Sequence, residues 1–597
     1  MNSFRYCTAL ILLIMILPIS AGAFDGRPTR IDATDLLREE VREVTRSLRR
    51  EPGVRSAKQY KVGDSETFWT RNLVTNAFEQ IEAVLEARGR HCYVFVESGR
   101  QVSSQAIENL RHNFDDIIYP TVRKNFGTEF NPGVDGDPRI FLLLHDIKDG
   151  YQGSGGFVAG YYYAVDSYKQ SSLPDHIKSN EREMLYLDID PADPSTVLFL
   201  DTVAHEFQHM VHSNQDKNEY TWVDESCAML ASYLCGYGHA SQLFNYKQTP
   251  DNSLTAWSPA RMLANYGQVY LWNYYVYSNV LQNFSEDERA KFFIDLVASQ
   301  KQGIAGYAEA LRKTTTSFTW SFVRFCIANF VNDKALGDGR YAYDNSLAHF
   351  RLPHSDQITT FPAKIEAGVY LWSADAIKID LTNAREQIQI DFEGFRGKMG
   401  YDLYNEFSVV LVLSDSSLNA QPSMTSLTVK DISNTKQGGT IKISPESNYD
   451  MALLIIIAHA PEEIDDIIYT KARPMNYKVQ ISDSGSRILR QSAKININNE
   501  LTNYANNAAN LDQIADSSSV AIAQLENTRR KINAGFISHI EQNNISELTE
   551  FVDLLNSHDK ATVAPIAQSI RQILKFQTII NNTPLIEKIF NSIEATE

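Results

Sequence analysis

The sequence predicts an α+β protein, because helical and strand patterns occupy separate parts of the chain. Residues 198–235 carry apolar side chains at helical spacing and include a pair of histidines. Short alternating apolar runs recur over residues 365–482, which is typical of an antiparallel β-sandwich. After about residue 487 tryptophan and cysteine are absent and Asn, Ala, Ile and Gln are frequent, so we expect a helical extension there.

At 597 residues the chain is too long for one ordinary hydrophobic core. We divide it into six parts: a signal peptide (1–23), a propeptide or N-terminal helix (24–61), the β-rich half of a first domain (62–195), its helical half (196–355), a β-sandwich domain (356–485) and a helical C-terminal extension (486–597).

The first residues predict export. Arg5 gives a positive start, residues 8–19 form an apolar run, and Ala21-Gly22-Ala23 matches a cleavage site. The run is too short to favour an uncleaved anchor, and no later segment is apolar over a bilayer's width. We therefore expect an extracellular, periplasmic or cell-surface protein with no stable membrane span after cleavage.

The net charge and the cysteine content indicate which partners and which disulfide bonds to expect. The net charge of -17 and the isoelectric point near 5.3 argue against nucleic acid as a partner. Cys7 leaves with the signal peptide, and the spacing of Cys92, Cys227, Cys235 and Cys326 is not that of a disulfide framework. We expect buried free thiols, with one pair involving Cys92 or Cys326 left open.

Residues 34–50 predict an amphipathic helix, ended by Pro52-Gly53. This helix belongs either to a removable propeptide or to the surface of the mature protein. The segment has no cysteine and no other obvious inhibitory ligand, so the sequence does not decide between the two.

Strand signals follow in residues 62–98, then a helix over 103–125 and a strand over 139–145. The turn at 131–138 contains aspartates that could hold Ca²⁺, although their spacing favours a plain turn. Residues 153–160 are glycine-rich and precede strands at 161–163 and 184–189. Such a strand is either an ordinary edge strand or one that pairs with an extended peptide substrate.

The principal motif is His205-Glu206-Phe207-Gln208-His209, on a helix that Ser195 or Thr196 can cap. Histidines four residues apart lie on one helical face, so both imidazoles can bind one Zn²⁺. Glu206 is rotated by about 100° from His205, which suits a general base beside the metal.

Three residues compete to be the third zinc ligand. The metzincin pattern fails, because His212 and Gln215 stand where glycine and histidine are required. His212 lies one turn further along the same helix and converges poorly on the ion. Glu225 begins a second helix, expected over 222–235, and is favoured over its neighbour Asp224.

The residues T-W-V-D-E-S at 221–226 resemble the W-x-N-E-G motif of gluzincin metallopeptidases, with Asp224 for asparagine and Ser226 for glycine. With the stretches SNEREMLYLD, TVAHEFQHMVH and YLCGYG, the chain is similar to the hyicolysin family of secreted bacterial metallopeptidases over about 62–353. The resemblance implies a thermolysin-like domain, zinc on His205, His209 and Glu225, and Glu206 as general base. Met229 replaces an aspartate of thermolysin-type enzymes, so another carboxylate, such as Asp201, must orient a zinc histidine.

We therefore expect a secreted zinc endopeptidase acting on protein or peptide substrates. Candidate donors to the oxyanion of the transition state are Tyr266, Tyr270 and His239. An aminopeptidase is an alternative, with Glu181 or Glu183 holding the substrate amine. A second alternative is a non-catalytic binding or adhesion protein, in which the β domain and the helical extension, with a protein partner, carry the function.

Overall fold

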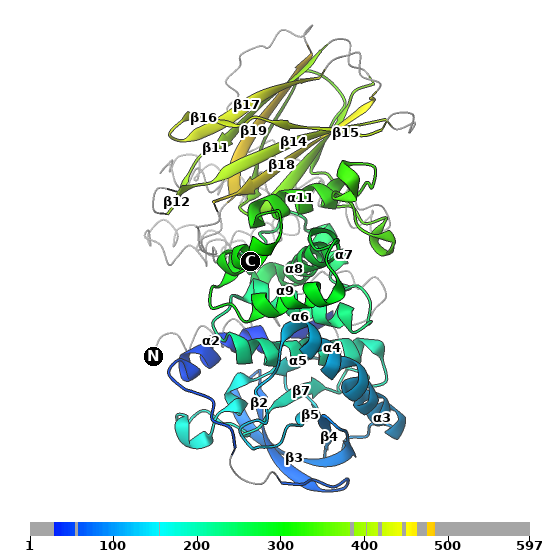
Figure 1. Ribbon diagram of the computed structural model, residues 1–597, viewed down its shortest axis with the longest axis vertical. Coiled ribbons are helices and arrows are strands. Elements are labelled where there is room, and N and C mark those ends of the chain that lie inside the picture. The colour runs from blue at the N-terminus through cyan, green and yellow to red at the C-terminus, as the bar shows by residue number, and fades with distance from the viewer. Residues whose placement is uncertain are drawn as a thin grey trace, which may run out of the picture. The chain divides into compact units, whose positions relative to one another are not determined.

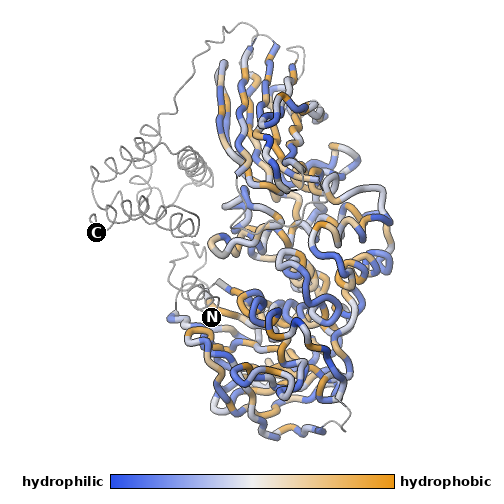
Figure 2. The backbone as a smooth tube through the Cα atoms, turned by 90° about the vertical axis from the view of Figure 1, so that its left-hand side faces the viewer, coloured by the Kyte–Doolittle hydropathy of each residue, from blue (hydrophilic) through white to orange (hydrophobic). Residues whose placement is uncertain are grey.

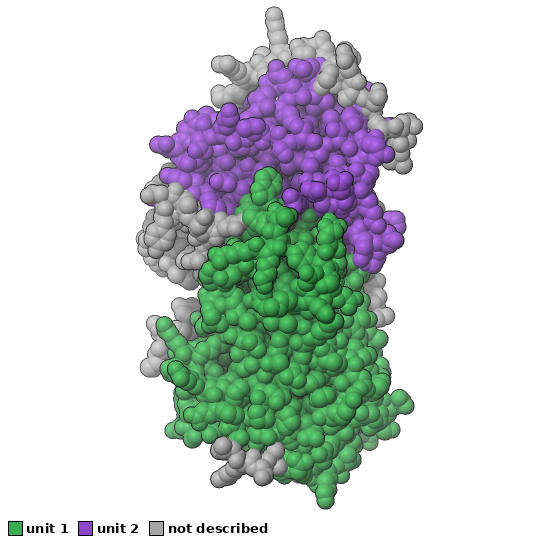
Figure 3. All heavy atoms as spheres, in the orientation of Figure 1, with its two compact units in different colours: residues 1–246, 257–321 green, residues 247–256, 322–597 purple. Residues whose placement is uncertain are grey.

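The computed structural model describes residues 29–53, 58–153, 156–382, 387–400, 403–415, 421–443, 449–461 and 474–483. The expected signal peptide and helical C-terminal extension lie outside these ranges and stay predictions. The chain divides into two compact units, coloured separately in Figure 3. The first consists of residues 1–246 and 257–321, and the second of residues 247–256 and 322–597.

A seven-stranded mixed sheet forms the base of the first unit. Its order is β1-β6-β7-β5-β4-β3-β2. The strands are β1 (Thr29–Asp32), β2 (Ser65–Asn72), β3 (Ala77–Arg88), β4 (Cys92–Glu97), β5 (Ile140–His145), β6 (Gly156–Tyr162) and β7 (Met184–Asp188). The strands expected in residues 62–98, 139–145 and 184–189 are therefore present, whereas the strand expected at 161–163 begins earlier, at Gly156, and ends at Tyr162. The central strands β4, β5 and β7 are buried along most of their length, as expected when both faces of a sheet are covered.

One long helix packs against β6 and β7 of this sheet, and a second packs against the first (Figure 1). They are α5 (Val197–Gln215), which carries the histidine pair, and α6 (Thr221–Leu234). The helix expected over 103–125 forms α3 (Ser104–Asn113), a π-helical turn and α4 (Tyr119–Phe126). The remaining helices of this unit are α7 (Leu243–Gln248), α8 (Met262–Tyr275), α9 (Glu286–Val297), α10 (Gly303–Ala310) and the start of α11 (Phe318–Val331).

The N-terminal segment, residues 29–53, packs on the first unit as a strand and a helix. β1 pairs in parallel with β6, and α2 (Thr34–Thr45) confirms the helix predicted from the periodicity of residues 34–50. Ala33 and Leu37 of this segment are buried in the core beside Tyr163 and Val165. A parallel neighbour at the edge leaves β6 with a backbone partner on each side.

The second unit contains two five-stranded sheets, with orders β15-β14-β18-β10-β8 and β16-β17-β11-β19-β9. The strands alternate between hydrophobic and hydrophilic residues (Figure 2), and all ladders except β8–β10 are antiparallel. Bounds are β8 (Asp356–Ile358), β9 (Ala363–Tyr370), β10 (Ser373–Asp380), β11 (Ile388–Phe395), β14 (Glu406–Ser414), β15 (Ser423–Leu427), β16 (Lys430–Ser433), β17 (Lys436–Ile443), β18 (Met451–His459) and β19 (Pro474–Asp483), with a small hairpin of β12 (Lys398–Gly400) and β13 (Leu403–Tyr404).

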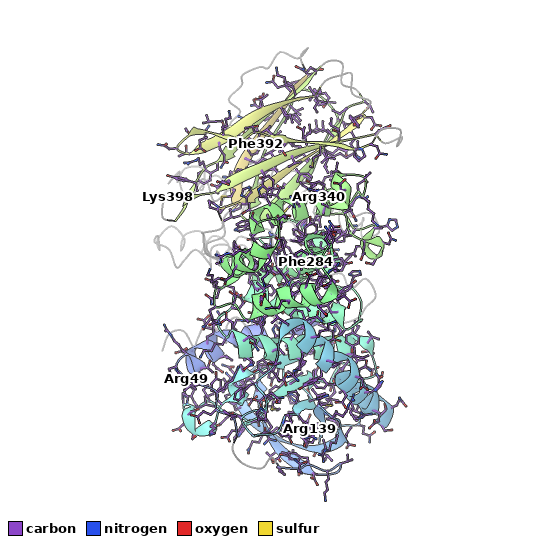
Figure 4. The ribbon with its side chains drawn as sticks, viewed as in Figure 1. Arg49, Arg139, Phe284, Arg340, Phe392 and Lys398 are labelled. Carbon is purple, nitrogen blue, oxygen red and sulfur yellow. The ribbon has the colours of Figure 1, made fainter. Side chains whose placement is uncertain are left out.

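Side chains join these two sheets into one core. Phe392 of β11, labelled in Figure 4, packs its ring 5.3 Å from that of Phe407 of β14. Tyr477 of β19 donates a hydrogen bond of 3.0 Å to Asp375 of β10. The expected mixed α+β organisation, with β-sheets late in the chain, is confirmed.

Two smaller expectations are met in the described ranges. Cys92, Cys227, Cys235 and Cys326 are all free and buried. No helix of the described part of the chain has the length and apolarity that a bilayer crossing requires.

Candidate metal centre

Four buried side chains direct one ligand atom each toward a common point. They are Asp32, His205, His209 and Glu225, and their ligand atoms all lie within 4.8 Å of one another. The Nε2 atoms of the two histidines are 3.0 Å apart. A Glu225 oxygen, Oε2, lies 3.3 Å from His205 Nε2 and 3.5 Å from His209 Nε2. Asp32 Oδ2 completes the group at 4.0 Å and 3.6 Å from the same nitrogens.

These separations fit a tetrahedral zinc site. Four atoms placed about 2 Å from one ion in a tetrahedron lie roughly 3.3 Å from each other. Both Glu225 oxygens and Asp32 Oδ2 are buried without a hydrogen-bond partner in the described residues. Buried carboxylate oxygens are costly when unpaired, so a cation at this position would satisfy them. The set could therefore hold a metal ion.

The helix α5 presents its histidines because it is capped and closely packed. Thr196 accepts a hydrogen bond of 3.3 Å from the Phe199 amide, which decides between the two predicted caps. A Cβ atom at Gly160 of β6 would lie 3.3 Å from Glu206 Cγ and 3.0 Å from the Tyr186 carbonyl oxygen. The glycine thus lets β6 approach the motif side of α5 closely.

α6 supplies two carboxylates with different contacts. Glu225 is fully buried and faces the histidine Nε2 atoms, whereas Asp224 Oδ1 lies 3.0 Å from His209 Nδ1, on the other side of that ring. A carboxylate only accepts, so His209 carries its proton on Nδ1 and directs the Nε2 lone pair into the cluster. Of the two candidates on α6, the structure places Glu225 among the ligand atoms.

One sequence expectation, the role of Asp201, is corrected here, whereas the exclusion of His212 from the ligands agrees with the structure. Asp201 does not orient a zinc histidine, because its carboxylate pairs with Arg30 at 2.8 Å. The carboxylate that contacts His209 Nδ1 is that of Asp224, which the sequence analysis considered only as a zinc ligand. His212 is outside the metal group, and its Nδ1 lies 2.9 Å from the same Asp224 oxygen. One carboxylate thus serves two histidines of consecutive turns, a contact that needs both helices in place.

Glu206 is buried, and its Oε2 accepts a hydrogen bond of 2.9 Å from Thr34 Oγ1. Burial, together with the negative charge of Asp32, raises the pKa of Glu206 well above its ordinary value. A carboxylate of raised pKa is a stronger base, which suits proton transfer near neutral pH.

Of the three candidate oxyanion donors, Tyr266 of α8 lies nearest the cluster in the contacts seen. Its ring is 6.4 Å from that of His205, and its buried hydroxyl has no hydrogen-bond partner in the described residues. Burial and the charge of Glu225 raise its pKa, so it stays a proton donor. Tyr270 instead hydrogen-bonds His239 at 2.6 Å.

Asp32 was not anticipated from the sequence. Asp32 lies two residues before the predicted helix of residues 34–50 and belongs to the metal group. No local pattern marks this aspartate.

Among the described residues, the side chains of the turn at 131–138 form no group of three or more His, Cys, Asp or Glu ligand atoms. Asp137 instead accepts hydrogen bonds from Tyr93 and Arg139, and Asp135 caps the turn at the Asp137 amide.

Comparison with known proteins identifies a metalloprotease that is similar to part of this chain. No family model matches the chain. Over 235 residues it is 30% identical to the neutral metalloprotease ShpI of Staphylococcus hyicus, an alignment covering 36% of this chain and 52% of ShpI. The chain thus spans about half the length of that relative. The predicted resemblance is confirmed as distant homology to this metalloprotease.

Proposed function

We propose that this chain is a secreted zinc-dependent endopeptidase with a thermolysin-like catalytic domain. His205, His209 and Glu225 would hold the zinc, and Glu206 is the general base. The observation that carries the proposal is the buried group of two histidines and a glutamate from separate helices, with the carboxylate of the H-E-x-x-H motif beside it. Distant homology to a neutral metalloprotease supports the same reaction.

The residues divide the work of peptide hydrolysis. Bound zinc supplies Lewis-acid chemistry, polarising a carbonyl and making water a stronger acid. Glu206 takes the proton of the attacking water at its carboxylate and delivers it to the leaving amine. The Tyr266 hydroxyl donates to the oxygen that becomes negative in the transition state. Asp224 keeps His209 in the tautomer that a metal requires.

An endopeptidase is favoured over an aminopeptidase because the carboxylates considered for amine binding are engaged elsewhere. Glu181 accepts from the Gln170 amide at 2.7 Å, and Glu183 accepts from the Val134 amide at 3.3 Å. Neither belongs to the metal group. Secretion rests on residues 1–23 and is part of the proposal, as is a protein partner for the C-terminal extension.

A non-catalytic binding or adhesion protein is the competing function. It would have no need for bound metal, so metal analysis separates the two. About one zinc per chain, lost together with proteolysis when a chelator is added, supports the enzyme. A metal-free, folded chain would favour the binding protein.

The decisive variant is Glu206→Gln, compared with Glu219→Gln. Glu219 is also buried, and its side chain accepts from the Tyr220 and Gly303 amides, so it matches the change in chemistry away from the cluster. Cleavage of a mixed peptide library is measured before and after limited trypsin digestion, with zinc content in parallel. We expect Glu206→Gln to keep its zinc and lose at least about 100-fold in rate. Glu219→Gln should behave as the parent, and an active Glu206→Gln would exclude the mechanism.

A further inference from the structure

The group of candidate metal ligands contains a fourth protein side chain, that of Asp32. Structural zinc sites have four protein ligands, whereas catalytic sites keep one position open for water or substrate. Here Asp32 Oδ2 lies 3.6 Å and 4.0 Å from the Nε2 atoms of His209 and His205. Asp32 is 8% exposed, so its carboxylate is held inside the site. A peptidase with this arrangement needs Asp32 to leave before it can turn over.

The residues following Asp32 contact the other functional groups of the site. Thr34 donates to Glu206 at 2.9 Å and so occupies the general base. Arg38 of α2 forms an ion pair with Asp224, the carboxylate behind His209. One short segment thus engages the ligand set, the base and the orienting carboxylate.

The same segment covers the edge of the sheet beside the site. β1 is the outermost strand and pairs with β6 through the register Thr29↔Gly156 to Asp32↔Gly160. The Ala33 amide donates to the Gly160 carbonyl at 3.2 Å, and the Tyr162 amide donates to Thr34 Oγ1 at 2.9 Å. An extended peptide substrate that adds to β6 would need this edge. The group delivered to the metal is a side-chain carboxylate, which offers no peptide bond to hydrolyse.

The contacts that hold the segment are largely polar. Arg30 pairs with Asp201 at 2.8 Å, Arg50 donates to Ser213 at 2.8 Å, and Lys217 donates to the Thr45 carbonyl at 2.7 Å. A cavity of about 40 Å³, lined by residues of α2 and α5, lies within this interface. Ala33 and Leu37 add apolar anchorage, so loss of one carboxylate should leave the segment in place.

We propose that residues 29–53 are an inhibitory segment and that Asp32 is the ligand that closes the metal site until the segment is displaced or cut away. This rests on the proposed function, because only a metallopeptidase requires the open position. The segment keeps the chain latent by three linked contacts: Asp32 at the metal, Thr34 on the general base and β1 on the substrate edge.

The test uses the full chain with Asp32→Ala, and Glu43→Ala as control. Glu43 lies on α2 and is exposed. Each protein is loaded with Co²⁺, whose visible spectrum reports coordination, and a peptide hydroxamate is added. Intact parent and Glu43→Ala should show no spectral change, because the fourth position is filled. Intact Asp32→Ala should keep one metal per chain and change its spectrum on binding the hydroxamate.

Peptide cleavage provides the second measurement. Intact Asp32→Ala should cleave at least about 10-fold faster than intact parent, and limited proteolysis should remove most of that difference. The activity of the parent should rise during limited proteolysis, and mass spectrometry of the same samples should show that residues 29–53 are lost over the same period. If Asp32→Ala fails to fold, Arg30→Ala, which removes the pair with Asp201, should speed this activation.

The outcomes separate the two proposals. If Asp32→Ala loses its metal and stays inactive, Asp32 is a permanent ligand and the inference is overturned. Equal cleavage by intact and cut parent likewise overturns it, while zinc binding and an inactive Glu206→Gln would leave the peptidase proposal standing. A chain that binds no metal in any form would overturn both.

Discussion

At the scale of the residue, Asp224 has the most connected position in the site. Its carboxylate contacts His209 and His212 of α5 and pairs with Arg38 of α2. Its neighbour Glu225 differs by one methylene and by 100° of helical rotation, which is enough to face the metal group instead. Adjacent acidic residues therefore have separate tasks.

Replacing Asp224 with asparagine should weaken metal binding. Asparagine can present an amide group to His209 Nδ1 and no longer fixes the tautomer or the charge behind it. We expect zinc affinity to fall by about 10- to 100-fold, measured by competition with a chromogenic chelator. Asp190→Asn, at an exposed position, is the control, and equal loss in both variants would contradict this role for Asp224.

At the scale of the element, the stability of α5 depends on the hydrogen bonds of its first turn. Its amino end is capped by Thr196, whereas the Ser195 hydroxyl donates to Asp193 at 2.7 Å and leaves the helix amides alone. The two residues are equivalent in sequence terms and differ only in how the preceding turn orients them.

Thr196→Ala should therefore destabilise the protein by about 1 kcal/mol, since it leaves the Phe199 amide without its partner. Ser195→Ala should have a much smaller effect. The midpoints of thermal unfolding of both variants and the parent, taken in one buffer with saturating zinc, measure the difference. A larger loss in Ser195→Ala would show that the other hydroxyl is the cap.

At the scale of the whole molecule, the first unit encloses several carboxyl groups that favour their neutral form. Burial raises the pKa of Asp166 to about 7 and those of Glu183 and Asp188 to about 8. Their ordinary values are 3.8 for aspartate and 4.5 for glutamate. As pH rises, the unfolded chain releases these protons before the folded chain does. The contribution of the three groups to the free energy of unfolding is therefore fully present below about pH 4 and is lost by about pH 8.

Asp188→Asn should flatten this decline, because asparagine can keep the Oδ1 contact to the Ile147 amide and has no charge to bury. Each pKa unit removed corresponds to about 1.4 kcal/mol. We expect the variant to gain thermal stability over the parent at pH 8 and much less at pH 5. Asp190→Asn, an exposed position, is the control, and a gain independent of pH would contradict the assignment.

The sequence by itself determined the features that depend on local spacing. The amphipathic periodicity of 34–50, the four-residue interval between His205 and His209, and the alternation in 365–482 each predicted an element that is present. The proximity of Glu225 also followed from sequence, because the next helix starts only a short loop after α5.

Tertiary structure decided the contacts between residues far apart in the chain. The Thr34–Glu206 hydrogen bond joins residues 172 positions apart, and Asp32 reaches the metal group only because β1 adds to the edge of β6. Asp224 rather than Asp201 contacts His209 because of the way α5 and α6 pack against each other. Helical and strand periodicity fixes which face a side chain occupies, but the partner across that face is set by packing.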